Sequence, residues 1–407
     1  MIKRERYLDQ LAAFRDTDLI KVITGMRRSG KSTLLELFSR QLAESGVPAD
    51  RIIRMNFESF EFSGIHEYRQ MYRHVREKAA GKGRCYLLLD EVQMVDGWEK
   101  AVNAFRVDLD VDITIIGSNA HLLSSELSTL LSGRYVEIHV WPLSFREYLA
   151  FAEAQGDRPP LDPVRTTALW NRYLQYGGLP VILSLQDDPQ VLRAYLAGIY
   201  STVILKDVVI RNQVRDGALL ERIMAYLAGN IGNPVNTKKI SDYLGNTGHK
   251  TTPDTVDSYL RMLQSAYIIH RADRYDTRGK ALLKTNAKYY LTDTGLRNEL
   301  LGFGQADYGR VYENVVFIEL LRRGYQVTVG KIGNLDVDFI ATRSDAVLYV
   351  QVTASLTDPA TRERELRPLL DLGDNYEKII LSMDVYPQDM NDRGIKLKNL
   401  VEFLLEG

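Results

Sequence analysis

Cysteine is almost absent from this chain of 407 residues, which contains a single one, Cys85. One cysteine excludes a disulfide framework and a cluster of thiolate metal ligands within one chain. Because Cys85 lies inside the apolar segment CYLLLD, we expect it to be a small buried side chain.

Long apolar runs are absent as well. No segment approaches the roughly 18 consecutive apolar residues of a membrane-spanning helix, and the N-terminal MIKRERYLDQL lacks the apolar stretch and cleavage site of a secretory signal. Repeats and low-complexity tracts are not found, which argues against a solenoid or a disordered tail. We therefore expect a soluble, cytoplasmic chain of separate globular domains with no membrane contact.

An excess of either charge is lacking over the whole chain, whose formal net charge is −1. The average conceals a local difference, because residues 211–290 contain 13 Lys and Arg against 7 Asp and Glu. A basic surplus of this kind suits contact with nucleic acid, and it also suits a solvated face.

Short β-rich segments alternate with helical patterns in the first third of the chain. The segment 18–25, DLIKVITG, precedes residues 33–46, in which leucines and Phe38 recur on one helical face. Trp98 and Tyr135 have the spacing of side chains packed against a sheet. The order predicts an α/β domain with a mostly parallel sheet flanked by helices. Its further strand candidates are RIIRMNF, CYLLLD and ITIIG.

The turn between the first strand and its helix carries a phosphate-binding pattern. GMRRSGKS at residues 25–32 fits G-x-x-x-x-G-K-[ST] in the context that the motif requires. Glycines let backbone N–H groups face phosphate oxygens, Lys31 reaches the β- and γ-phosphates, and Ser32 ligates Mg²⁺. We predict a site for ATP with Mg²⁺, with GTP left open, formed by Gly25, Ser29, Gly30, Lys31, Ser32 and Thr33.

Polar residues at the ends of later strands complete a catalytic pattern with Lys31. Asp90 is predicted to hold Mg²⁺ together with Ser32, and Glu91 to orient or deprotonate the attacking water. Asn119 has the position of a water-orienting residue, and Arg134 could reach the γ-phosphate of its own or a neighbouring subunit. The alternatives are a solvated strand cap for the acids, a turn for Asn119 and a surface ion pair for Arg134.

The remainder of the chain divides at changes in composition. The breaker-rich QGDRPPLDP opens a helical stretch, and a helix-rich segment with a basic hairpin follows. After Gly304, an amphipathic helix, several strands and a further helix near residues 362–372 predict a second α/β domain. We expect a P-loop ATPase core at 1–155, a helical lid or linker at 156–214, a winged helix at 215–303 and a C-terminal domain at 304–407.

Helix starts within the third segment predict a helix-turn-helix with a wing, because Thr252 and Pro253 suit an N-cap and a first turn. Such a helix can enter the major groove of duplex DNA, while basic side chains meet phosphates. The alternatives are a rigid spacer and a dock for a protein. The candidate DNA contacts are Thr255, Ser258, Arg261, Lys250, Arg271, Arg274, Arg278, Lys280 and Lys284.

Several motifs together, including LLLDEVQ, LLSGRYVEIHVWPLSFREYL, YGGLP and KTNAKYYLTDTGLRN, carry a resemblance to a family. Over nearly its whole length the chain resembles prokaryotic AAA-like P-loop ATP-binding proteins with a nuclease-like C-terminal domain. The resemblance implies a P-loop ATPase domain, a winged helix and a restriction-endonuclease-like α/β fold of the PD-(D/E)xK type. It assigns the family's phosphate-loop, acidic and polar positions to Gly25, Gly30, Lys31, Ser32, Asp90, Glu91 and Asn119.

The nuclease-like slots of the C-terminal domain are altered. A PD-(D/E)xK site needs carboxylates for Mg²⁺ and a lysine for the attacking water, whereas the slots here contain Glu313, Asp338, Gln351 and Thr353. Gln351 adds no negative charge and Thr353 no ammonium, so we expect a degenerate site without cleavage. A migrated lysine such as Lys331 would restore the chemistry.

Three functions follow from these patterns. The leading hypothesis is an ATPase whose nucleotide state repositions the winged helix and the nuclease-like module on DNA or on a protein partner. The alternatives are a slow nucleotide-gated switch or scaffold, and an ATP-dependent nuclease. An arginine acting between subunits would require a homo-oligomer, which the sequence leaves open.

Overall fold

The computed structural model describes residues 2–117, 133–154, 161–210, 212, 214, 216–277, 279, 281–302, 308–344, 346–387 and 390–406. The chain forms two compact units. Unit 1 comprises Met1–Pro142 with Ser265–Tyr267, and unit 2 comprises Leu143–Gln264 with Ile268–Gly407. No helix within the described ranges is both long and apolar enough to cross a membrane.

A five-stranded sheet forms the centre of unit 1. Its strand order is β2-β3-β4-β1-β5, and every neighbouring pair is parallel. The predicted α/β domain with a parallel sheet is therefore confirmed. The strands are β1 (Ile20–Thr24), β2 (Ile52–Asn56), β3 (Cys85–Asp90), β4 (Val111–Ile116) and β5 (Tyr135–His139).

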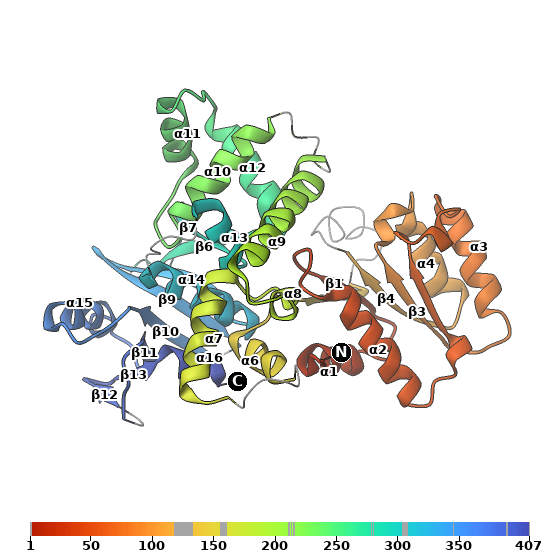
Figure 1. The fold of residues 1–407 in the computed structure, drawn as a ribbon, viewed down its shortest axis with the longest axis horizontal. Coiled ribbons are helices and arrows are strands. Elements are labelled where there is room, and N and C mark those ends of the chain that lie inside the picture. Colours follow the sequence, from red (N-terminus) through yellow and green to blue (C-terminus); the bar gives the residue numbers. More distant parts are fainter. Residues whose placement is uncertain are drawn as a thin grey trace. The chain divides into compact units, whose positions relative to one another are not determined.

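Helices cover both faces of this sheet, with α1 and α2 on one face and α3 and α4 on the other (Figure 1). Side chains of β3 alternate between the two, since Leu87 packs in the α3–α4 cluster and Leu88 in the α1–α2 cluster. Cys85, Trp98 and Tyr135 pack in the first cluster, as expected. The helices are α1 (Glu5–Ala13), α2 (Lys31–Glu44), α3 (Tyr68–Ala79) and α4 (Trp98–Asp108), with short 3-10 helices η1 (Ala49–Arg51), η2 (Phe60–Phe62) and η3 (Val92–Met94).

Unit 2 contains an eight-stranded mixed sheet in the order β12-β13-β11-β10-β9-β8-β6-β7. The basic hairpin β6–β7 belongs to it, because β6 pairs in parallel with β8. The expected boundary between a winged helix ending at residue 303 and a separate C-terminal domain is thus crossed by one sheet. The strands are β6 (Ile269–Asp276), β7 (Ala281–Leu291), β8 (Gln326–Ile332), β9 (Leu335–Arg343), β10 (Ala346–Val352), β11 (Glu377–Ser382), β12 (Asn391–Asp392) and β13 (Ile395–Asn399).

The helices that were expected to form a lid or linker belong to unit 2, and not to the unit that contains the five-stranded sheet. Buried aromatic rings join α14 to the unit 2 sheet, where Tyr290 stacks on Phe317 at 4.2 Å between ring centroids. The helices are α6 (Phe145–Glu153), α7 (Pro163–Tyr176), α8 (Pro180–Ser184), α9 (Pro189–Thr202), the π-helix η5 (Val203–Ile210), α10 (Gly217–Gly229), α11 (Thr237–Asn246), α12 (Pro253–Ser265), α13 (Thr294–Leu301), α14 (Tyr308–Arg322), α15 (Pro359–Leu370) and α16 (Leu400–Leu405).

Candidate nucleotide site

The glycine loop lies between β1 and α2, at the carboxyl edge of the parallel sheet. Gly30 is the N-cap of α2 with φ 98°, and no side chain among the described residues caps the helix there. Gly25 has φ 130°, and a Cβ added to it would lie 2.2 Å from the carbonyl oxygen of Val140. Only glycine fits at residue 25, and the uncapped backbone N–H groups of α2 are suited to bind an anion.

Lys31 is buried beneath the loop, with its ammonium donating hydrogen bonds of 2.9 Å to the carbonyl oxygens of Gly25 and Met26. These hydrogen bonds hold the Lys31 ammonium beside the helix N-terminus, the position from which it is predicted to reach phosphates.

Arg4 supports the loop from outside the motif. Its guanidinium donates to the carbonyl oxygens of Ser29 at 3.0 Å and Trp141 at 2.9 Å, and lies 4.5 Å from the centre of the Tyr7 ring. These contacts fix the loop against the segment after β5. Sequence reasoning missed Arg4, because it lies 25 residues from Ser29 and outside any motif.

Asp90 and Glu91 lie at the end of β3. Burial raises the pKa of the Asp90 carboxyl, and this is opposed by a hydrogen bond with the side chain of Ser32 and by the charge of Lys31. The structure thus brings together the two residues predicted to hold Mg²⁺. Asp90 Oδ1 is buried and has no hydrogen-bond partner among the described residues. An orphaned carboxylate oxygen beside a hydroxyl is a donor set that a hard divalent cation satisfies.

Glu91 has an unusual backbone, with φ 52° in a region that favours glycine. Burial raises the pKa of its carboxyl, and the nearby charges of Asp90 and Glu58 raise it further. The side-chain amide of Gln93 donates a hydrogen bond to Glu91 and holds it in place. A carboxyl group with a raised pKa is a stronger base, which suits proton abstraction from water.

A polar layer lies behind the loop on β1 and β5. The Thr24 hydroxyl donates to Glu137 Oε1 at 2.6 Å and lies 3.1 Å from His139 Nδ1. The Tyr267 hydroxyl donates to the same Glu137 oxygen at 3.2 Å. Because Thr24 directly precedes Gly25, this layer fixes the point where the loop leaves the sheet. Nothing in the local sequence marks these four residues as partners.

Two catalytic candidates remain, Asn119 and Arg134. Asn119 lies outside the described residues, so its predicted role stays a prediction. Arg134 precedes β5, and its backbone carbonyl accepts from Ile20 at the start of β1. The loop follows Thr24 at the other end of that strand, about 13 Å away for four residue steps. The backbone of Arg134 therefore lies at the opposite edge of the sheet from the loop, which favours action on a neighbouring subunit's phosphate over action on its own.

The candidate DNA contacts fall into different environments. Arg274 is buried and pairs with Asp336 at 2.5 Å, so its predicted phosphate contact is wrong. Arg261 pairs with Asp257 on the surface of α12. Lys250 is exposed, Thr255 and Ser258 are half-buried, and Arg271 pairs with Asp273. Arg278, Lys280 and the side chain of Lys284 lie outside the described residues.

A charged cluster occupies the nuclease-like slots of unit 2. Lys288 on β7 donates to Glu313 Oε1 at 2.8 Å and lies 3.7 Å from Asp338 Oδ1. The Tyr290 hydroxyl donates to the same Glu313 oxygen at 2.6 Å. The lysine observed beside Asp338 is therefore Lys288, while Lys331 lies opposite Asp336 on the neighbouring strand and its suggested role stays a prediction. Lys288 is 50 residues distant in sequence from Asp338, which is why the local pattern did not reveal it.

The amide of Gln351 links this cluster to α15. Its oxygen accepts from the backbone N–H of Asp338 at 3.1 Å, and its nitrogen donates to Glu365 at 2.7 Å. Thr353 is buried, and its backbone N–H donates a hydrogen bond to the carbonyl oxygen of Leu381. Burial, with the charge of Glu313, raises the pKa of Asp338 to about 7. Among the described residues no group of three His, Cys, Asp or Glu is placed to hold a metal ion.

The fold and the loop define unit 1 as an AAA-type P-loop ATPase domain. The family described as AAA domain matches residues 17–149, and a family described only as a domain of unknown function matches residues 167–307. The chain belongs to the same family as an uncharacterized protein of Haemophilus influenzae, to which it is 43% identical over 407 residues, covering 100% of this chain and 99% of that protein.

Two further relatives are more distant. An uncharacterized protein of Methanocaldococcus jannaschii is 29% identical over 371 residues, covering 89% of this chain and 78% of that protein. The solved structure of a Walker-type ATPase of Pyrococcus abyssi is similar with a TM-score of 0.53 and 16% identity, covering 74% of this chain and 96% of that one. At this identity the likeness concerns the fold alone. The winged helix and the nuclease-like domain stay predictions.

Proposed function

We propose that the chain binds ATP with Mg²⁺ at residues 25–33 and hydrolyses it. The observation that carries the proposal is the buried, unpartnered Oδ1 of Asp90 beside Ser32, at the N-terminus of an uncapped helix. This arrangement offers donors to an anion and oxygen ligands to a cation within one site. Lys31 supplies the compensating positive charge for the phosphates.

The residues present fit a magnesium ion. Asp90 and Ser32 would hold it, and when bound it would neutralise charge on the phosphate oxygens. Ser29 is fully buried within the loop, and Ser32 and Thr33 are both exposed on the first turn of α2. The loop backbone and the side chains of Lys31 and Ser32 are proposed as the main nucleotide contacts.

Glu91 is the general base of the proposal. Its carboxylate accepts a proton from water as the water oxygen bonds to the γ-phosphorus, and the bond to the β–γ bridging oxygen breaks to give ADP and phosphate. The left-handed backbone at Glu91 and the hydrogen bond from Gln93 hold this carboxylate at the end of β3. Asn119 is proposed to orient the same water.

Hydrolysis is proposed to reposition unit 2 on duplex DNA or on a protein partner. Strands β6 and β7, which follow α12 in the chain, belong to the eight-stranded sheet of unit 2. Helices α10 to α12 and this sheet would therefore move as one body. Among the described residues, the DNA candidates that remain are Lys250, Thr255, Ser258, Arg261 and Arg271, and Arg278, Lys280 and Lys284 stay predictions. Action of Arg134 on a neighbouring subunit's nucleotide would make a homo-oligomer the active form.

Steady-state hydrolysis of ATP and GTP, with binding of a fluorescent ATP analogue measured in parallel, tests the catalytic part. We expect Glu91→Gln to keep nucleotide binding and to lose about 10² to 10⁴ in turnover, the usual contribution of a general base. Lys31→Ala should lose both binding and turnover. Turnover of Glu91→Gln equal to that of the unmodified protein would reject Glu91 as the base. If Glu91→Gln also loses nucleotide binding, Gln93→Ala tests the base instead, because it keeps the Glu91 carboxylate and removes the hydrogen bond that holds it.

Added duplex DNA across a salt series distinguishes the first two functional hypotheses. Stimulated turnover that weakens steeply with salt favours action on DNA, because phosphate contacts release counterions. Unchanged turnover, with assembly that depends on nucleotide in analytical ultracentrifugation, favours the switch or scaffold. Arg134→Ala tests action between subunits, since this variant should reduce turnover only where the protein oligomerises.

We propose that unit 2 does not cleave DNA. Lys288 forms an ion pair with Glu313 and lies 3.7 Å from Asp338, and Gln351 contributes an amide where the nuclease pattern has an acid. Incubation of plasmid and linear DNA with ATP and either Mg²⁺ or Mn²⁺ tests this, with Asp338→Ala as the control. Cleavage that disappears in Asp338→Ala would establish the ATP-dependent nuclease instead.

A further inference from the structure

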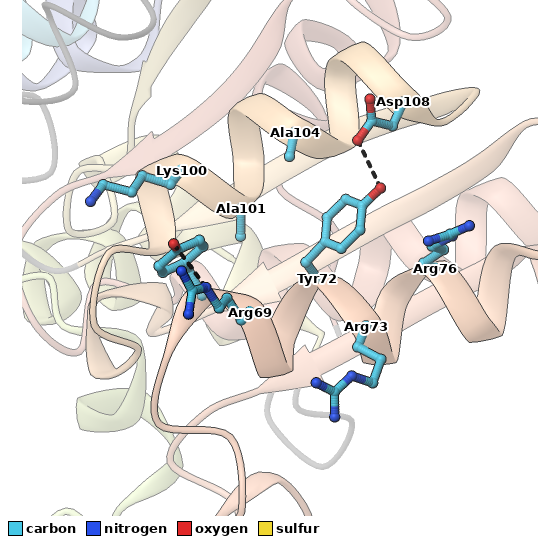
Figure 2. A pocket seen from close by; sticks show the side chains of 9 residues that line it. Arg69, Tyr72, Arg73, Arg76, Lys100, Ala101, Ala104 and Asp108 are labelled. Carbon is cyan, nitrogen blue, oxygen red and sulfur yellow. Dashed lines mark hydrogen bonds between the residues drawn. The ribbon is translucent and has the colours of Figure 1, made fainter.

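A groove on unit 1 lies between α3 and α4, on the face of the sheet opposite α1 and α2. Its volume is about 490 Å³. In Figure 2, Tyr72 reaches from α3 toward Asp108 on α4, and the small side chains of Ala104 and Ala101 follow along α4 toward Lys100. The groove is separate from the nucleotide loop and takes no part in the proposed hydrolysis.

Basic side chains line this groove. Arg69, Arg73 and Arg76 recur at intervals of four and three residues, so they form one stripe along α3, with about 6 Å and about 4.5 Å of helix rise between them. Lys100 faces them from α4. All four are exposed, and no carboxylate pairs with any of them among the described residues. The lining therefore carries a concentrated positive charge, opposed by Asp108 alone.

Aromatic rings accompany the cations. The Arg69 guanidinium and the Lys100 ammonium lie 5.5 Å and 5.4 Å from the centre of the Tyr68 ring. Tyr72 stacks on Phe105 with an interplanar angle of 7° and donates to Asp108 at 2.7 Å. Asp108 is thereby engaged with a tyrosine and leaves the arginines unpaired. The groove combines a row of cations with the rings of Tyr68 and Tyr72.

We propose that this groove binds a single-stranded nucleic acid, with its phosphates on the arginine stripe and its bases against the tyrosines and alanines. Guanidinium groups bind phosphate oxygens in pairs, and base stacking on aromatic rings is how proteins bind single strands without sequence preference. The volume lies within the roughly 300 to 1,000 Å³ of sites for small organic molecules, which suits successive nucleotides and not a rigid duplex. An acidic peptide would use the cations but would not need the tyrosine rings.

Fluorescence anisotropy of the full chain tests the proposal. The probes are labelled oligothymidylate and oligouridylate of about 20 nucleotides, longer than the roughly 4 to 16 that one single-strand-binding domain covers. The variant Arg69→Gln/Arg73→Gln/Arg76→Gln should weaken binding at least about ten-fold and lower the salt slope by about 2, as expected for three lost phosphate contacts. The matched control Arg6→Gln/Arg40→Gln/Arg54→Gln removes the same charge from exposed positions outside the groove, and should change binding less than about two-fold.

Two further measurements keep the test decisive. Photo-crosslinking of an oligonucleotide with 5-bromouridine to the unmodified protein should place the crosslink in peptides covering 68–76 or 100–108. Lys31→Ala should bind the single strand normally, which separates this site from the nucleotide site. Equal weakening in both triple variants, crosslinks elsewhere, or stronger binding of polyglutamate or of duplex DNA would overturn the proposal.

Discussion

Each of the two units contains a buried lysine near a buried aspartate, but the two lysines are paired differently. Lys31 donates to two backbone carbonyls, and Asp90 beside it retains an unpartnered oxygen. Lys288 lies between two carboxylates, and Asp338 accepts from the backbone of Val352. The first arrangement leaves hydrogen-bonding capacity on Asp90 for a ligand. The second satisfies its own groups, so it is suited to stabilise a fold.

Removing the Lys288 ammonium should produce the largest effect on stability. Lys288→Met leaves Glu313 and Asp338 in a buried site without a counter-charge, and we expect it to lower the free energy of unfolding by about 3 to 5 kcal/mol. Urea unfolding followed by circular dichroism measures the change. The double variant Lys288→Met/Glu313→Gln should recover part of the loss. A loss below about 1 kcal/mol would show that Lys288 is not a structural counter-ion.

Gly25→Ala tests the loop by geometry and not by charge. Its methyl group would lie 2.2 Å from the Val140 carbonyl oxygen at a φ of 130°, so we expect a loss of about 1 to 3 kcal/mol in stability. ATP binding should weaken as the loop shifts. Gly64→Ala is the control, because nothing lies within 4 Å of its added Cβ. Unchanged ATP affinity in Gly25→Ala would mean that the loop tolerates this displacement.

The dependence of stability on pH sharpens the account of unit 2. The pKa of Asp338 is raised to about 7, so between about pH 4 and 7 the folded chain holds a proton that the unfolded chain releases. The stability that Asp338 contributes therefore falls as pH rises from about 4 to 7. Burial lowers the pKa of His270 to about 4, so its contribution instead falls as pH drops from about 6.5 to 4. Each slope is at most about 1.4 kcal/mol per pH unit.

Unfolding measured between pH 4 and 7 separates the two groups. With rising pH, Asp338→Asn should gain stability relative to the unmodified protein, whereas His270→Asn should lose it. Parallel pH profiles for both variants and the unmodified chain would contradict both assignments.

Lys31→Ala should have the smallest effect on stability. Its two hydrogen bonds to loop carbonyls contribute little net free energy, so we expect a change within about 1 kcal/mol in the absence of nucleotide. MgATP should raise the melting temperature of the unmodified protein and leave that of Lys31→Ala unchanged. A destabilisation as large as that of Lys288→Met would remove the contrast between the two lysines.

Local patterns made unit 1 predictable. The loop at residues 25–32, the acids after β3 and four of the five strands follow from short stretches in which apolar runs end at glycine or carboxylate. Arg4, Glu137 and Tyr267 could not be predicted, because each meets the loop region through contacts between distant segments. Side-chain hydrogen bonds across a fold leave no periodic trace in sequence.

Unit 2 was less predictable for the same reason. The helices and strands after residue 304 were expected near their observed places, but the pairing of β6 with β8 was not. A turn-rich segment between two strands indicates a boundary only when the strands belong to different sheets. Lys288 and Glu365 reach the altered nuclease-like slots from β7 and α15, so a motif confined to neighbouring strands could not include them.

The pairing of β6 with β8 also limits where this protein can be divided. A fragment ending at residue 302 would keep the hairpin but lose β8, leaving the inner edge of β6 open to pair with other chains and aggregate. Recombination between genes would meet the same barrier, since a crossover in this interval separates strands that stabilise one another. The helices and the strands of unit 2 are therefore expected to be inherited, expressed and exchanged as a single piece.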